Sequence, residues 1–431
     1  MILNAGKPKA LIFCKPGYIF DEFYGPLIHR LSAQFRLSLL LTEDFINESI
    51  RQILEEYLKD GMIHKYRFIP SFNCSQWAWV YHGKVVTTVK ECFKEDIKLL
   101  LLSNETFFVH RCLIYYARKK EAWVITLQTD TMVQIRKQYR KQLTNGEYLA
   151  KEKVDVLRSV MSLGRQRWES LKRQWRMVCD AYIYPPLHMR TIFWRNHWDR
   201  YAFAAGRSDA VICYGHSDMK ALQWVMPDLK NVFFACHPSQ GKCRCEQGSS
   251  LEPKNKLLVT FPSRMNDLDP RRLDRWKTVI KHVVELSRIR EVHLRPHPSS
   301  IRHKGDWLEK LAFEIQQQGY FCEIMDPMLK SLVSIVCDYK ILVGSPSGAL
   351  RTARFSCENI VIIGIPNSTT GNDLDQEWIL EGIEGIQWVD LHEQIEQKHL
   401  ERTDFKKWKT ADFSEVITSM VKENGGMLCT K

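Results

Sequence analysis

The hydrophobic and polar positions of the first half of the chain alternate in blocks that are typical of an α/β protein. Four short apolar runs predict buried strands, at residues 10–14, 37–41, 97–102 and 122–127. Between them, stretches with helical periodicity predict helices, at residues 21–34, 45–58 and 106–120. Strands and helices that alternate with this spacing predict a doubly wound sheet.

Two regions of the first half depart from this rhythm. Residues 61–97 are more irregular, and the pair His82-Gly83 predicts a hairpin turn there. Residues 131–200 are long, helical in pattern and basic, which predicts a helical insertion. The α/β pattern then returns with predicted strands at 208–214 and 232–235.

The second half restarts the same pattern after a polar stretch without periodicity. Predicted strands lie at residues 256–261, 291–294, 321–325, 339–343 and 360–363. Predicted helices lie at residues 270–287, 307–318, 328–337, 349–355 and 413–421. We expect the last of these helices to cross back to the first domain.

The length of 431 residues agrees with two domains. We expect an N-terminal Rossmann-like domain at 1–236, a linker at 237–255 and a C-terminal Rossmann-like domain at 256–431. The predicted fold class is therefore α/β, with two Rossmann-like domains that face a cleft and a basic helical insertion at about 131–200 in the first.

The positive charge of the chain predicts an anionic partner. The formal net charge is +12, and residues 134–176 alone hold twelve Lys or Arg against four Asp or Glu. Trp168 and Trp175 are seven residues apart and share one helical face. Three interpretations stay open: an anionic membrane surface, a nucleic-acid surface, which we disfavour, and solvated helices whose tryptophans pack inward.

Compartment and metal chemistry follow from apolar runs and cysteine spacing. No stretch approaches the length of a membrane span, and the N-terminus lacks the apolar core of a signal peptide. These features predict a cytoplasmic protein. If the basic helices bind lipid, the protein would be peripheral on the inner face of the cytoplasmic membrane. Scattered cysteines in apolar segments suit a reducing compartment. The group Cys236, Cys243 and Cys245 lacks the paired spacing of a zinc site, so we expect neither a metal nor a cofactor.

Two sequence blocks that follow predicted strands predict a phosphate site. The first is Arg295-Pro296-His297-Pro298, and the second is Gly344-Ser345-Pro346-Ser347-Gly348, directly before a helix. A helix N-terminus has free N–H groups and the positive end of the macrodipole, which suit phosphate. The two serines add hydroxyl donors, Gly348 allows close approach of a ligand, and His297 and Arg295 supply cations. In the structural alternative the serines only cap the helix and His297 only ends a strand.

These blocks resemble the HP and S motifs of bacterial sialyltransferases, polysialyltransferases and capsule Kdo transferases, which have the GT-B architecture. The resemblance implies that His297, Ser345 and Ser347 hold the phosphate of a CMP-activated sugar. It also implies an inverting, metal-independent glycosyltransferase that moves an acidic sugar, of sialic acid or Kdo type, to a glycan or lipid-linked acceptor. The product would be a capsule, lipopolysaccharide or similar surface glycan.

Other families share parts of the pattern. Phe261-Pro262-Ser263-Arg264 is similar to the arginine element of CDP-glycerol glycerophosphotransferases, which implies a phosphate role for Arg264. Non-hydrolysing UDP-sugar 2-epimerases are similar in architecture. A CDP-polyol phosphotransferase and a UDP-sugar 2-epimerase-like enzyme therefore stay open, and so does a non-catalytic protein that binds an anionic polymer.

The general base is the least defined part of the predicted site. The acidic block that supplies it in the sialyltransferases has no match, since Lys59-Asp60-Gly61 holds only one carboxylate. Ligands of open α/β sheets bind at the C-terminal ends of strands, where three carboxylates qualify. Asp130 and Glu22 come first and Glu105 next.

Overall fold

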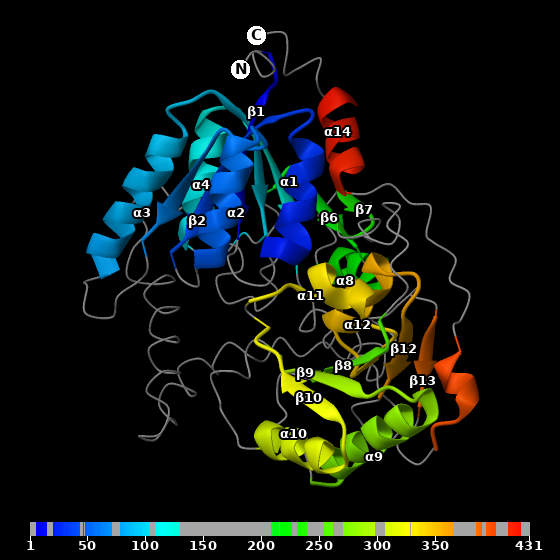
Figure 1. Ribbon diagram of the computed structural model, residues 1–431. Helices are drawn as coiled ribbons and strands as arrows, with labels where there is room; N and C mark the ends of the chain where they lie inside the picture. The colour runs from blue at the N-terminus through cyan, green and yellow to red at the C-terminus, as the bar shows by residue number, and fades with distance from the viewer. Residues whose placement is uncertain are drawn as a thin grey trace, which may run out of the picture. The chain divides into compact units, whose positions relative to one another are not determined.

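The computed structural model describes residues 6–14, 20–43, 46, 48–70, 78–103, 105, 108–129, 208–214, 216–225, 231–238, 254–261, 270–297, 307–327, 329–365, 385–389, 394–401 and 413–423. The chain divides into two compact units. Unit 1 comprises Met1–Phe20, Leu27–Ala235 and Phe413–Lys431, and unit 2 comprises Asp21–Pro26 and Cys236–Asp412. Each unit is built on its own sheet (Figure 1).

Unit 1 contains a seven-stranded parallel sheet in the order β3-β2-β1-β4-β5-β6-β7. Its strands are β1 (Lys9–Cys14), β2 (Arg36–Thr42), β3 (Lys65–Ile69), β4 (Ile97–Leu102), β5 (Trp123–Leu127), β6 (Ala210–Cys213) and β7 (Val232–Phe234). The central strands β1 and β4 are apolar and almost wholly buried, because helices cover both faces of the sheet (Figure 1).

The helices around this sheet have continuous apolar faces. They are α1 (Gly25–Leu31), α2 (Glu48–Lys59), α3 (Ala78–Cys92), α4 (Phe108–Lys119), α8 (His216–Val225) and α14 (Phe413–Glu423); the π-helical turn η1 (Phe20–Tyr24) groups with unit 2 from Asp21 on. Helices α3 and α4 share one core with Leu11 and Leu100 of the central strands. The C-terminal helix α14 belongs to unit 1, where Phe413 stacks on Tyr214 and Thr418 donates a hydrogen bond to Gln34. The expected return of this helix to the first domain is confirmed.

Unit 2 contains a six-stranded parallel sheet in the order β10-β9-β8-β11-β12-β13. Its strands are β8 (Lys256–Thr260), β9 (Glu291–Arg295), β10 (Phe321–Ile324), β11 (Ile341–Gly344), β12 (Val361–Gly364) and β13 (Ile386–Trp388). Its helices are α9 (Pro270–Ser287), α10 (Trp307–Gln317), α11 (Leu332–Ile335) and α12 (Gly348–Ser356), with 3-10 turns η7 (Val336–Asp338) and η8 (Gln397–Leu400).

Alternate residues of each strand in unit 2 face two different helical layers. Leu257 and Val259 belong to a core with α9 and α10, whereas Leu258 belongs to a core with α11 and α12. Helix α12, which opens at the end of β11, is therefore fixed to the sheet through its own apolar side.

The predicted strands are observed within a few residues, and the differences lie in the irregular region and at the sheet edges. The hairpin turn predicted at His82-Gly83 is wrong: both residues lie inside α3, because Tyr81, Val85 and Val89 form one buried stripe at helical spacing. Strand β3 has no predicted counterpart, since this edge strand is mostly half-buried and lacks a continuous apolar run. Strand β13, at the other sheet's edge, was missed for the same reason.

The predicted basic insertion at 131–200, with its helices at 134–176, lies outside the described residues. Among the helices that are described, none combines the length and the apolar character needed to span a bilayer.

Candidate functional site

The turn from β11 into α12 brings a strand end and a helix start unusually close together. A Cβ atom on Gly344 would lie 2.4 Å from Oγ1 of Thr260 and 2.5 Å from Cδ2 of Leu350. Real Cβ atoms do not approach other atoms so closely, so only glycine allows Leu350 to seat the first turn of α12 on the sheet. The predicted strand–turn–helix unit is present.

Two serine hydroxyls lie in this turn without a structural task. Ser345 is 1% exposed, and its Oγ atom has no hydrogen-bond partner within the described part of the chain. Ser347 is the N-cap residue of α12 with extended backbone, but its side chain makes no capping hydrogen bond. Capping therefore accounts for the position of Ser347 and not for its hydroxyl. Together with the unpaired N–H groups of the first helical turn, these hydroxyls form a donor-rich site.

The side of the first turn of α12 is bordered by Arg351, a residue that no motif marks in the sequence. The Nη2 atom of Arg351 lies 3.8 Å from the position of a Cβ atom on Gly348. Arg351 is 7% exposed, so its charge is largely removed from water. Burial lowers the pKa of the neighbouring His237 well below its ordinary value, and the charge of Arg351 adds to this shift.

Arg295, predicted as a phosphate ligand, has structural contacts. Its Nη1 atom donates to the carbonyl oxygen of Lys330 at 2.8 Å, and its Nη2 atom donates to that of Pro327 at 3.2 Å. Burial lowers the pKa of Arg295 from its ordinary value, and the negative charge of Glu22 opposes this shift. Two of its three guanidinium nitrogens thus hold the loop after β10.

The other predicted phosphate ligands are less informative. His297 follows β9 and is half-buried. Arg264 and Pro298 lie outside the described residues.

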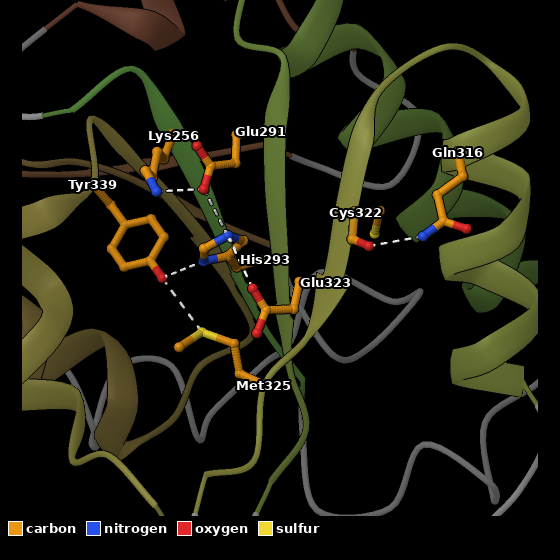
Figure 2. A network of polar contacts seen from close by, with 8 residues as sticks. All are labelled: Lys256, Glu291, His293, Gln316, Cys322, Glu323, Met325 and Tyr339. Atoms are coloured by element: carbon orange, nitrogen blue, oxygen red, sulfur yellow. Dashed lines mark hydrogen bonds and ion pairs between the residues drawn. The ribbon is translucent and has the colours of Figure 1, made fainter.

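A polar network on the same strand as Arg295 explains the alternating sequence of β9. The residues are shown in Figure 2. The Nδ1 atom of His293 forms a hydrogen bond of 2.6 Å with the hydroxyl of Tyr339 (Figure 2). The Nε2 atom of His293 lies 3.0 Å from Oε1 of Glu291, and Glu291 also forms an ion pair with Lys256. Burial lowers the pKa of His293, while the charges of Glu291 and Glu323 oppose the change. Each of these side chains contacts another member of the network, so we assign it to the stability of unit 2.

The three predicted base residues have different surroundings. Glu105, next to β4, is 0% exposed, and its Oε1 atom accepts hydrogen bonds from the hydroxyls of Ser208 at 2.6 Å and Thr126 at 3.1 Å. Glu22 lies in the segment of η1 that groups with unit 2. Asp130 lies outside the described residues.

A second buried carboxylate of unit 1, Asp218, was not predicted. It lies in the first turn of α8 and accepts a hydrogen bond from Nε2 of Gln128 at 2.6 Å. The Oε1 atom of Gln128 in turn accepts the backbone N–H of Tyr214 at 3.0 Å. This chain of contacts ties the ends of β5 and β6 to α8, and it gives Asp218 a structural partner.

Within the described residues, no group of three or more His, Cys, Asp or Glu side chains is arranged to hold a metal ion. Cys236 is buried, whereas Cys243 and Cys245 lie outside the described residues.

Comparison with known proteins identifies the architecture. No protein-family model and no curated protein matches the sequence. Among solved structures, the chain is similar to a protein from Listeria monocytogenes assigned as a UDP-N-acetylglucosamine 2-epimerase, with a TM-score of 0.52, 10% identity and 98% of each chain covered. It is also similar to S. aureus MnaA solved with UDP, with a TM-score of 0.51, 10% identity and again 98% of each chain covered.

These likenesses, together with the two parallel sheets, show a two-domain α/β fold of the GT-B type, as the sequence predicts. The narrower resemblance to sialyltransferases and Kdo transferases rests on the sequence motifs alone.

Proposed function

We propose that this protein is an enzyme that acts on a nucleotide-activated sugar, and that unit 2 holds a phosphate of the nucleotide at the N-terminus of α12. One observation carries the proposal: Ser345 keeps a buried hydroxyl without a partner among the described residues beside this helix end. A buried hydroxyl that is left unpaired costs about 1–3 kcal/mol. A ligand that accepts its hydrogen bond recovers this cost, and phosphate is the anion that a helix N-terminus suits best.

The chemistry of such a site agrees with a leaving phosphate. Cleavage of the bond between a sugar and a nucleotide places negative charge on phosphate oxygens, which N–H and O–H donors held in place stabilise. The hydroxyls of Ser345 and Ser347 and the free amides of the first turn of α12 are donors of this kind. His297 remains a proposed ligand of the same phosphate, as the HP motif implies.

The reaction that the sequence motifs favour is inverting glycosyl transfer from a CMP-linked acidic sugar. The general base of this reaction stays with Asp130 and Glu22, because Glu105 is fully buried and its Oε1 atom already accepts the hydroxyls of Ser208 and Thr126. An acceptor on a surface glycan or lipid carrier, and attachment to anionic membranes through residues 134–176, remain predictions.

A second reaction, epimerisation of a UDP-sugar at C2, is favoured by the structural likeness to the Listeria protein. The UDP in the MnaA structure likewise favours a uridine nucleotide over a cytidine nucleotide for the proposed site. Both reactions need the nucleotide phosphate to be held firmly, so the α12 site is common to them.

Nucleotide binding tests the shared part of the proposal, and product analysis separates the reactions. We expect the melting temperature of the purified protein to rise with at least one of CMP, CDP, UDP and GDP at millimolar concentration, since a ligand at about 100 times its Kd adds about 2.7 kcal/mol. Incubation with UDP-N-acetylglucosamine should then yield its C2 epimer if the protein is an epimerase. Slow release of CMP from a CMP-linked acidic sugar would support transfer.

The competing class is a non-catalytic protein that binds an anionic polymer. Such a protein would show no shift with any of the four nucleotides, and its polymer affinity would fall steeply with salt. That combination of results would overturn the proposed function.

A further inference from the structure

The segment between β1 and α1 carries a carboxylate into unit 2. Residues Asp21–Pro26 group with unit 2, although the strand before them and the helix after them belong to unit 1. The segment begins within the π-helical turn η1, and π-helical turns are rare and frequent at functional sites. Phe23 and Tyr24 are each 1% exposed, and their rings pack edge to face with centroids 5.3 Å apart, which fixes the turn. Glu22 lies in the same turn and is half-buried.

The first contact of this segment leads to the end of β9. Burial lowers the pKa of Arg295 and the negative charge of Glu22 opposes that shift, so the carboxylate lies within electrostatic reach of the guanidinium. Arg295 pairs with Thr260, and Thr260 pairs with Gly344, so these three residues form one row at the C-terminal ends of β9, β8 and β11. Adjacent strands are about 4.8 Å apart, which puts the backbone of Arg295 about 10 Å from that of Gly344. Glu22 therefore lies at the sheet edge where α12 begins.

The second contact of the segment leads to α12 itself. The ring of Phe23 packs edge to face on His237, with centroids 5.4 Å apart. Burial lowers the pKa of His237, and the charge of Arg351 adds to the shift, so His237 lies near that arginine. The Nη2 atom of Arg351 is 3.8 Å from the position of a Cβ atom on Gly348, the first residue of α12. Both contacts thus place the turn that holds Glu22 beside the proposed phosphate site.

We propose that Glu22 is the general base of glycosyl transfer, and that it faces the acceptor hydroxyl while the N-terminus of α12 holds the phosphate of the donor. This inference rests on the proposed function, because the phosphate site defines where the reacting sugar lies. The chain thereby supplies the base to unit 2 from a segment between two elements of unit 1.

The reaction step balances with these groups. The hydroxyl oxygen of the acceptor forms a bond to the anomeric carbon, and its proton passes to the carboxylate of Glu22. The bond between the anomeric carbon and the phosphate oxygen breaks, and its electron pair leaves with the phosphate. The hydroxyl of Ser345 and the amides of the first turn of α12 stabilise that charge. When water is the acceptor, the products are the sugar and the nucleotide, and Glu22 releases the proton to solvent.

The place of Glu22 suits the far side of the sugar. A general base lies about 3 Å from the oxygen that it deprotonates, and in an inverting displacement the sugar separates this oxygen from the leaving phosphate. The base is therefore expected at a distance from the helix end. The interaction with Arg295 is compatible with this role, because an ionised carboxylate has about four acceptor positions on its two oxygens.

The test measures turnover and nucleotide affinity of the full-length protein in parallel. Release of CMP from CMP-linked sialic acid, and of UDP from UDP-N-acetylglucosamine, is followed with water as the acceptor. Glu22→Gln should lower the rate by about 100- to 10,000-fold, which is the usual contribution of a general base. Its affinity for the free nucleotide should change by less than about threefold, because the variant removes no ligand of the phosphate.

Three further variants separate proton transfer from a structural role. Glu22→Ala should regain activity when formate is added, because a small carboxylate can take the vacated place and accept the proton. Glu22→Asp keeps the carboxylate and should retain more activity than Glu22→Gln; it also serves if the glutamine variant does not fold. Glu323→Gln removes an exposed carboxylate from β10 of the same unit and should leave the rate and the affinity unchanged.

The remaining outcomes decide the assignment. A Glu22→Gln protein with the wild-type rate would overturn it, and a loss of rate in Asp130→Asn would then move the base to Asp130. A loss of rate that formate does not restore, or that an equal loss of nucleotide affinity accompanies, would make Glu22 a structural residue. A wild type that binds nucleotide but turns over neither donor would overturn the role of Glu22 and leave the phosphate site standing. A wild type that binds no nucleotide would overturn both.

Discussion

The unpaired hydroxyl of Ser345 leads to a prediction in which stability and binding change in opposite directions. In the ligand-free protein the Ser345→Ala change removes a buried polar group that has no hydrogen-bond partner within the described residues. The expected gain in the free energy of unfolding is about 1–3 kcal/mol. For a unit of about this size each kcal/mol corresponds to about 2–4 °C, so the melting temperature of unit 2 should rise by several degrees.

The same change should weaken nucleotide binding. A hydrogen bond from a hydroxyl to a charged phosphate contributes about 1.5–3 kcal/mol, which corresponds to a loss of affinity of about 10- to 100-fold. At a nucleotide concentration of about 100 times the wild-type Kd, the wild type gains about 2.7 kcal/mol, and a variant that binds 30-fold more weakly gains only about 0.9 kcal/mol. Ligand at this concentration should therefore lower the stability advantage of the variant by about 1.8 kcal/mol, which cancels or reverses an advantage in the lower half of the expected range.

The assay is a thermal melt of both proteins with and without the best-binding nucleotide, supported by calorimetric affinities. Ser356→Ala is the control, because Ser356 lies at the other end of α12 and its Oγ atom is also buried without a described partner. It should raise the melting temperature and leave the affinity unchanged. A lower melting temperature of Ser345→Ala without ligand would show that the hydroxyl has a partner. An unchanged affinity would show that it does not face the nucleotide, and either result refutes the reasoning.

Three further predictions concern the surroundings of the site. Gly344→Ala should destabilise the protein by about 1–3 kcal/mol in urea unfolding and also weaken nucleotide binding, because its Cβ atom would push Leu350 and the start of α12 away from the sheet. Tyr339→Phe should cost about 1–3 kcal/mol by depriving His293 of its Nδ1 partner, with nucleotide affinity unchanged. Because the pKa of His237 is lowered in the folded state, the folded protein binds fewer protons than the unfolded protein once the pH falls below 6.5. The free energy of unfolding should therefore fall there by up to about 1.4 kcal/mol per pH unit. The His237→Gln variant should show a smaller slope.

The controls for these changes are specific. Gly364→Ala places a Cβ atom 2.3 Å from the Trp388 ring at the end of β12, so it should destabilise unit 2 comparably while the folded fraction keeps its nucleotide affinity. A Gly344→Ala protein of unchanged stability would contradict the close approach of strand and helix. A Tyr339→Phe protein with lower nucleotide affinity would place the polar network of Figure 2 in the binding site. An acid profile of His237→Gln identical to the wild type would assign the loss of stability to other groups.

Much of the fold follows from local patterns in the sequence. Buried parallel strands such as β4 and β11 are continuous apolar runs, and each stands between helices with apolar faces, so their presence and order could be read before any tertiary contact was known. The block Ser345-Pro346-Ser347-Gly348 likewise predicts a turn into a helix, and the structure contains that turn. Strands β3 and β13 were not predicted, because an edge strand buries less of its surface and its sequence need not be apolar.

The roles of individual side chains were decided by tertiary structure alone. Arg295 is the last residue of β9 and stands just before the block Pro296-His297-Pro298, yet its guanidinium donates to carbonyls more than thirty residues away in the sequence. Arg354 lies in a helix whose sequence marks no role for it, and only the structure shows that its guanidinium donates to the carbonyl oxygen of Ile360. Periodicity reports which face of an element is apolar, because that depends on neighbours along the chain. The partner of a buried charge depends on which distant segment packs against it, and no local pattern contains that information.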